Sequence, residues 1–180
     1  MDETSTEDTA KLEDSLMRGA VAGDGAAMEQ LYSLTASALF SYLRRLGCGR
    51  ADADDLLQTT YLNAWRSRTR FRGTGARPWL FSIARNAFLT YVGKEARSSV
   101  DNPPPSALST PAENMAASDL SRRIDRALNE LPADTREAVV LSRVSGLSIS
   151  DIAGLLNTSE GNVRVRIHRG LTHLKEDIGL

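Results

Sequence analysis

Hydrophobic residues recur at spacings of three and four along most of this chain, which places them on one face of a helix. Leu57, Tyr61 and Trp65 form one such series. No stretch alternates with the period of two that marks a strand, so the pattern predicts an all-α protein. The expected helices span 10–22, 25–46, 52–68 and 77–95 in the first half, and 119–130, 134–144, 149–156 and 160–175 in the second.

One segment interrupts this periodicity. Residues 98–118 hold four of the six prolines, are rich in serine and alanine, and have no sustained apolar period. Such a composition buries too little apolar surface to offset the entropy lost on ordering. We therefore expect two small helical domains, at 11–97 and 119–180, joined by a flexible linker over 98–118. An acidic disordered tail is expected over 1–10.

Helix starts carry local signals of their own. Pro78 lies where a helix begins, the position at which the missing N–H of proline does no harm. Asp134 with Glu137 three residues later resembles a capping box, and Ser148 with Asp151 is a weaker version.

The composition is that of an ordinary soluble chain, with 41% hydrophobic and 25% charged residues. No apolar run approaches the roughly 18 to 20 residues that span a bilayer, so no membrane insertion is expected. Residues 1–14 carry six acids against Lys11 alone, unlike a secretory signal. Cys48 is the only cysteine, which rules out an internal disulfide and fits a reducing cytoplasm.

No constellation typical of an enzyme is visible. The sequence has neither a Gly-rich phosphate loop nor a nucleophile elbow. His168 and His173 lie about 140° apart around a helix, which makes them a poor metal pair. We therefore predict no enzymatic activity, no metal and no cofactor.

Charge is distributed unevenly along the chain. The formal net charge is −1, which at first argues against a nucleic-acid partner. Between residues 60 and 97, however, eight basic residues face a single acid, Glu95. A local basic surface attracts phosphate even when the whole chain is nearly neutral. The alternative is a solvated basic face with no partner.

Residues 148–169 have the layout of a helix-turn-helix. A short helix meets a polar turn at 157–159, and Ser159 is suited to cap the helix that follows. In such motifs the second helix enters the DNA major groove. The alternative is an ordinary amphipathic surface helix. A helical wheel gives this second helix a packing stripe of Val163, Ile167, Leu171 and Leu174, and an opposite face of Asn162, Val165, Arg169 and Thr172, flanked by Arg164, Arg166 and His168.

The first domain narrows the choice among helix-turn-helix proteins. Residues 53–65 (ADDLLQTTYLNAW), then Phe71-Arg-Gly with 78–86 (PWLFSIARN), resemble the docking and promoter-melting segments of bacterial extracytoplasmic-function (ECF) sigma factors. In the second domain 131–141 (LPADTREAVVL) and 161–170 (GNVRVRIHRG) resemble region 4 of that family. The resemblance implies a factor that directs RNA polymerase to chosen promoters.

The resemblance also implies partners and site residues. The protein would bind the β′ clamp helices and the β flap of core RNA polymerase. It would bind promoter DNA at the minus-10 and minus-35 elements, and an anti-sigma factor would inhibit it. The implied residues are Asp54, Asp55, Gln58 and Leu62 for core docking; Phe71, Arg72, Arg85 and Asn86 for the minus-10 element; and Asn162, Arg164, Val165, Arg166, His168 and Arg169 for the minus-35 element.

Three positions depart from a simple reading of these motifs. Thr59 replaces the acid that usually follows the glutamine, and Val165 stands where many relatives carry a polar residue. Gly170, inside the second helix, costs about 1 kcal/mol relative to alanine, and the sequence gives no reason for it.

Two other functions remain as alternatives. One is a stand-alone helix-turn-helix regulator whose N-terminal domain senses a ligand or dimerises. The other is an enzyme with a DNA-binding appendage, which has no catalytic constellation to support it.

Overall fold

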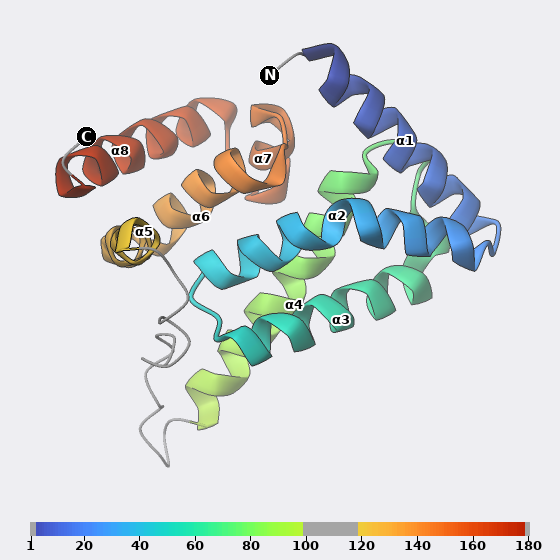
Figure 1. Cartoon of the computed structure of the whole chain (residues 1–180), viewed down its shortest axis with the longest axis horizontal. Coiled ribbons are helices and arrows are strands. Elements are labelled where there is room, and N and C mark those ends of the chain that lie inside the picture. The colour runs from blue at the N-terminus through green and yellow to red at the C-terminus, as the bar shows by residue number, and fades with distance from the viewer. Residues whose placement is uncertain (1–2, 99–118, 179–180) are drawn as a thin grey trace.

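A computed structural model describes residues 3–98 and 119–178, and no strand occurs in either range (Figure 1). The helices are α1 (Glu3–Val21), α2 (Gly25–Arg45), α3 (Arg50–Ser67), η1 (Arg68–Arg70), α4 (Ala76–Ser98), α5 (Asp119–Glu130), α6 (Ala133–Val140), η3 (Leu141–Ser145), α7 (Ile149–Leu155) and α8 (Glu160–Ile178). The all-α prediction is confirmed. We call residues 3–98 the N-terminal domain and residues 119–178 the C-terminal domain.

The first helix is longer than its sequence pattern predicted. α1 begins at Glu3, so the predicted disordered tail is wrong for residues 3–10. Acidic residues near a helix N-terminus interact favourably with the helix dipole, and Lys11 lies 3.8 Å from Glu7 and 4.0 Å from Asp8. The predicted linker lies outside the described residues, apart from Ser98 at the end of α4.

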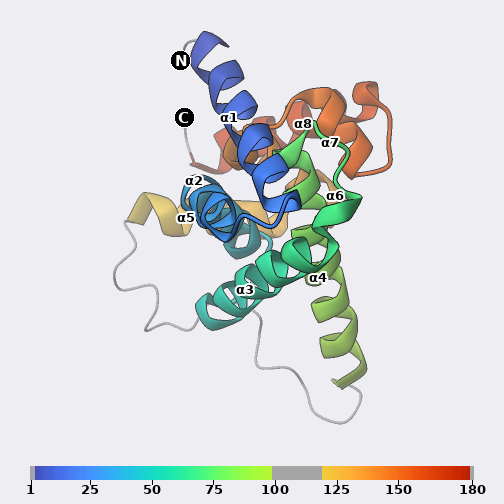
Figure 2. The same ribbon diagram turned by 90° about the vertical axis from the view of Figure 1, so that its right-hand side faces the viewer.

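In the N-terminal domain α2, α3 and α4 pack together, and α1 crosses α2 and α4 (Figures 1 and 2). Tyr42 and Phe81 are fully buried and meet edge to face, with ring centroids 5.4 Å apart. Asp24 caps α2 by accepting hydrogen bonds from the backbone N–H groups of Ala26 and Ala27. Aliphatic and aromatic burial thus fixes the relative positions of the four helices.

In the C-terminal domain α8 packs across α6 and against α5 and α7. Gly170 of α8 is buried in this packing. A Cβ atom there would lie 2.5 Å from Cγ2 of Val139 and 3.1 Å from Cγ2 of Thr135. Gly170 therefore lets α8 and α6 approach more closely than any residue with a side chain would. This close approach explains why a glycine occupies this position in the helix.

The two predicted capping boxes have different outcomes. The Ser148–Asp151 box is complete at the start of α7, with both reciprocal hydrogen bonds present. The Asp134–Glu137 box is wrong, because α6 begins at Ala133 after Pro132 and has no side-chain cap. Both acids then lie inside α6, where their side chains make contacts with other elements.

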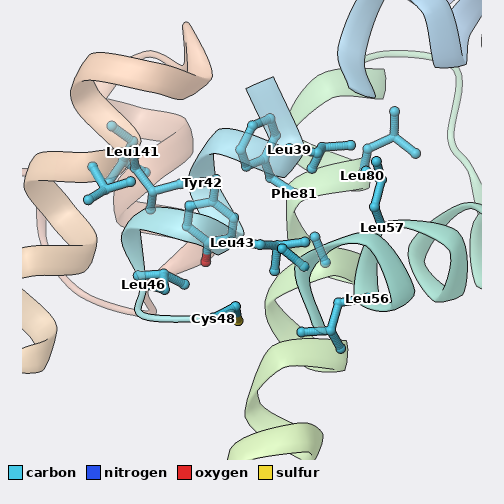
Figure 3. Close-up of a cluster of buried hydrophobic side chains, with 14 of the residues drawn as sticks. Leu39, Tyr42, Leu43, Leu46, Cys48, Leu56, Leu57, Leu80, Phe81 and Leu141 are labelled. Atoms are coloured by element: carbon cyan, nitrogen blue, oxygen red, sulfur yellow. The ribbon is translucent and has the colours of Figure 1, made fainter. Parts of the chain in front are cut away.

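The two domains share one continuous hydrophobic core in this arrangement. Leu141 of η3 belongs to the same buried cluster as Tyr42, Leu39 and Phe81 of the N-terminal domain (Figure 3). The hydroxyl of Tyr42 donates to Oε1 of Glu137 at 2.7 Å. Burial is the larger cause, and the Glu137 carboxylate the next, of a pKa of the Tyr42 phenol far above its ordinary value. Tyr42 is therefore the donor in this hydrogen bond.

Cys48 lies where the two domains meet, and its thiol is expected to react slowly with thiol reagents. It is 4% exposed, and burial, with the nearby Asp52 carboxylate, raises its pKa to about 12. Because the thiolate is the reactive form, the native protein should react with Ellman's reagent roughly a thousandfold more slowly than the urea-unfolded chain at pH 8. Equal rates for the native and unfolded chains would contradict this burial.

Candidate nucleic-acid interface

The recognition helix predicted from the sequence is α8. Val163 is fully buried while Asn162, Val165 and Arg169 are exposed, as the helical wheel predicted. The hydroxyl of Ser159 accepts a hydrogen bond from the Asn162 N–H at 3.2 Å, which caps the start of this helix. The exposed face therefore stands clear of the packing face.

The basic residues of α8 differ in what they contact. Arg166 lies 2.9 Å from Asp134 of α6, with its side chain 29% exposed. Arg164 pairs with Glu160 one turn earlier, at 3.0 Å, and is 62% exposed. Arg169 and His168 are exposed. Arg166 is thus held against the domain, while Arg164 and Arg169 extend from it.

A groove of about 780 Å³ with both polar and apolar lining runs between α3 and α4. One wall comes from α3 and η1, and the other from the middle and end of α4. Ile83 and Tyr91 add apolar and aromatic surface to it. Its basic and amide side chains are Asn63, Arg66, Arg70, Asn86 and Lys94.

The groove separates the basic residues of the 60–97 segment into two groups. Arg66, Arg70 and Lys94 line it. Arg68 instead stacks on Trp65, 4.2 Å from the ring centroid. Arg77 pairs with Glu13, and Arg85 pairs with Glu137. The sequence predicted an excess of positive charge, but it did not single out Arg66, Arg70 or Lys94 as site residues.

The residues expected at the minus-10 element fall in different environments. Asn86 lines the groove. Arg72 is exposed in the loop before α4. Phe71 is only 7% exposed and packs on Trp79, with ring centroids 5.7 Å apart. Arg85 points to the C-terminal domain, where its Nε donates to Oε1 of Glu137 at 2.9 Å.

These contacts change what two of the residues can do in this arrangement. The ring of Phe71 is covered by the domain, so it anchors its loop and offers little surface for a base to stack on. The guanidinium of Arg85 is occupied by a carboxylate of the other domain. The groove therefore brings together Asn86 and basic residues that the motif comparison had not assigned.

The residues expected to dock on the polymerase share one exposed face of α3. Asp54, Asp55 and Gln58 are exposed, and Leu62 has 55% of its surface exposed. Thr59, beside this face, also lines the groove. An exposed leucine next to acids and an amide is suited to a partner with both apolar and basic side chains.

Within the described ranges, no cluster of three or more His, Cys, Asp or Glu side chains could hold a metal ion. Among those same residues, no helix is both long and apolar enough to cross a bilayer.

The fold and these surfaces define a two-domain helical protein with a helix-turn-helix in its second domain. Residues 31–98 match the family model of Sigma-70 region 2, and residues 121–174 match that of Sigma-70, region 4. The chain is 38% identical over 163 residues to the RNA polymerase sigma factor CarQ of Myxococcus xanthus, covering 87% of this chain and 92% of the relative. It is 35% identical over 167 residues to the ECF sigma factor SigL of Mycobacterium tuberculosis, with the same coverage. The chain belongs to the ECF family of RNA polymerase sigma factors.

Two solved structures share the fold. The sigma factor RpoE of Bartonella quintana, in complex with the anti-sigma factor NepR, aligns with a TM-score of 0.74 at 30% identity, covering 84% of this chain and 96% of that one. CnrH, in complex with the cytosolic domain of CnrY, aligns with a TM-score of 0.71 at 26% identity over 92% and 96% of the two chains.

Proposed function

We propose that this sigma factor docks on core RNA polymerase through the exposed face of α3 and captures single-stranded minus-10 DNA in the groove between α3 and α4. The observation that carries the proposal is the content of this groove: three cations and two amides around an apolar floor. Single-stranded DNA is bound by cations that follow the backbone and by flat surfaces that contact bases. The amide of Asn86 would read the edge of an unstacked base.

The docking face carries the other half of the N-terminal function. Asp55 and Gln58 would meet the β′ clamp helices of the polymerase, and Leu62 would bury its exposed surface there. Burying an apolar side chain stabilises the complex by roughly 25 cal/mol per Å², and the acids would pair with basic residues of the partner. The C-terminal domain would meet the β flap.

The C-terminal domain would read the minus-35 element through α8. Arginine is suited to guanine edges in the major groove, and asparagine to adenine. Arg169 and Asn162 share the exposed face, and Arg164 lies beside them near the DNA backbone. Val165 would contact a thymine methyl group rather than a polar base edge.

Regulation by an anti-sigma factor is part of the proposal. RpoE and CnrH, two solved structures with similar folds, are each in complex with a partner protein, NepR for RpoE and CnrY for CnrH. The close packing of the two domains, with Arg85 occupied by Glu137, is compatible with a form of this chain that does not engage promoter DNA. A cognate inhibitor would bind and stabilise such a form.

Transcription with purified core enzyme tests the proposal. Core polymerase plus this protein should yield transcripts whose mapped start sites share upstream minus-10 and minus-35 sequences. Asn86→Ala should lower permanganate reactivity of the minus-10 thymines while the holoenzyme still forms. Unchanged reactivity would remove Asn86 from the proposed groove function.

The minus-35 assignment predicts different effects for two arginines of α8. Arg169→Ala should weaken promoter binding by about 1–3 kcal/mol and relax selectivity at one minus-35 position. Arg166→Ala should leave selectivity unchanged, because Arg166 is held by Asp134. Transcription from a panel of minus-35 variants measures both. A parallel fall on every variant promoter would make Arg169 a phosphate contact only.

A further inference from the structure

The loop between η1 and α4 is anchored at its first residue by the buried Phe71, but the two glycines that follow do not fix the rest of its path. It covers residues 71–75 and contains Gly73 and Gly75, both with positive φ, at 94° and 74°. A Cβ added at Gly73 would meet nothing within 4 Å, so packing around that glycine does not hold the loop. Glycine loses more conformational freedom on folding than any other residue, and a loop with two glycines therefore needs external contacts to keep one conformation.

Those contacts come from α1, which is distant from the loop in sequence but lies beside it in the fold (Figure 2). Nη1 of Arg18 donates to the carbonyl oxygen of Gly73 at 2.9 Å. Oδ1 of Asp14 accepts from the backbone N–H of Ala76, the first residue of α4, at 2.7 Å. α1 thus holds both the middle of the loop and its junction with α4.

A third contact fixes the next residue along. Glu13 is 1% exposed although it is an acid. Its Oε2 accepts from Nε of Arg77 at 2.9 Å, and its Oε1 accepts from Nη2 of the same guanidinium. Nη1 of Arg77 donates to the carbonyl oxygen of Ser145 in the C-terminal domain at 3.0 Å. The first turn of α4 is therefore tied on one side to α1 and on the other to the second domain.

The loop lies where the proposed function needs a fixed geometry. Arg70 lines one wall of the groove immediately before the loop, and Asn86 lines the other wall on α4 after it. Arg72 is exposed within the loop itself. The position of Arg72 relative to Asn86 therefore depends on the path of residues 71–75. The family match for region 2 begins at residue 31, so α1 lies outside it.

We propose that α1 is a positioning element for minus-10 capture: Asp14 and Arg18 hold the 71–75 loop in the shape that presents the exposed Arg72 to single-stranded DNA. The inference rests on the proposed function of the groove. Asp14 and Arg18 act through the loop and need not touch DNA. Loss of either contact should weaken single-strand capture while core docking, on the other face of α3, persists.

The test measures binding of holoenzyme to a single-stranded 12-mer that carries the minus-10 sequence found by start-site mapping. Asp14→Ala should weaken this binding by about tenfold, the equivalent of one lost helix cap. Asp14→Asn should restore it to within about twofold, because the amide oxygen can still accept the Ala76 N–H. Holoenzyme formation and binding of minus-35 duplex should be unchanged in both variants.

The matched control is Asp24→Ala, which removes a capping carboxylate from α2 instead of α4. It should lower the melting temperature as a lost cap does but leave binding of the 12-mer unchanged. If Asp14→Ala and Asp24→Ala weaken binding of the 12-mer equally, and the two variants have equal melting temperatures, α1 is only a structural support and the inference fails. Arg18→Ala, at an exposed position, provides the same test if Asp14→Ala does not fold.

A third variant separates this inference from the function on which it rests. Asn86→Ala should weaken binding of the 12-mer, because a direct contact with a base is lost. If Asn86→Ala weakens binding and both Asp14→Ala and Arg18→Ala do not, positioning by α1 is wrong and the groove function stands. If Asn86→Ala has no effect, the groove function itself is wrong.

Discussion

Replacing Gly170 with alanine is expected to destabilise the protein, although alanine is the better helix former. The added methyl group would lie 2.5 Å from Cγ2 of Val139, a side chain that is 2% exposed and branched at Cβ. Overpacking of this kind costs about 1–3 kcal/mol, against a helix-propensity gain of about 1 kcal/mol. We expect a net loss of up to about 2 kcal/mol in the free energy of unfolding, and a larger loss for Gly170→Val, which adds two further methyl groups.

Gly154 of α7 is the matched control. It is an exposed helical glycine, and a Cβ atom there would meet nothing within 4 Å. Gly154→Ala should therefore stabilise the protein by up to about 1 kcal/mol. Urea unfolding at constant m-value measures both changes. The same sign for the two substitutions would contradict the close approach of α8 and α6, as would failure of Val139→Ala to reduce the cost of Gly170→Ala.

Gly170 also separates the features that could be predicted from the sequence from those that could not. The helical period, the Ser148–Asp151 box and the exposed face of α8 follow from spacings of three and four residues, so they could be found without coordinates. The role of Gly170 depends on Val139, which is distant in sequence, and no local pattern encodes that contact. The sequence could show that a glycine was costly there, but not what it accommodated.

The candidate site was predictable to the same degree. Asn86 and the face of α3 were found because they belong to recognisable local motifs. Arg85 was assigned to DNA because it belongs to the same motif as Asn86, yet it lies about 100° from Asn86 around the helix and pairs with Glu137. The groove residues Arg66, Arg70 and Lys94 come from three elements, and only their packing brings them together. The four-residue spacing of the polar residues Asn86, Thr90 and Lys94, which all line the groove from α4, was the available signal.

Substitutions on the docking face are expected to have the largest functional effect. In the proposed complex, Asp55→Arg would place a positive charge against a basic partner surface, and Leu62→Asp would put a charge into an apolar contact. Interface residues of this kind contribute 2 kcal/mol or more, so each substitution should weaken core binding by at least about 30-fold. Transcription from the mapped promoters should fall in proportion. Binding of labelled variants to core enzyme, followed by fluorescence anisotropy, measures the change.

Glu29→Arg is the control for the change in charge. Glu29 is an exposed acid on α2, so its replacement alters net charge by the same amount as Asp55→Arg. Core affinity should stay within about twofold of wild type, since exposed charges separated by more than roughly 10 Å are largely screened at 0.1 M salt. Equal losses for Glu29→Arg and Asp55→Arg would show that net charge, and not the α3 face, determines docking.

The central claim is that this protein recognises promoters as a subunit of RNA polymerase and not alone. A stand-alone regulator binds its operator unaided, commonly as a dimer with two recognition helices. The residues that the structure describes include one such helix. Residues 119–180 hold nine basic and nine acidic residues, a balance that supplies few phosphate contacts.

A gel shift of promoter duplex at near-physiological salt, with and without core enzyme, tests this claim most directly. We predict weak, salt-sensitive binding by the purified protein, converted by core polymerase to tight, sequence-specific binding that Asp55→Arg abolishes. Nanomolar, specific binding by the protein alone, unchanged when core polymerase is added, would contradict the account and favour a stand-alone regulator.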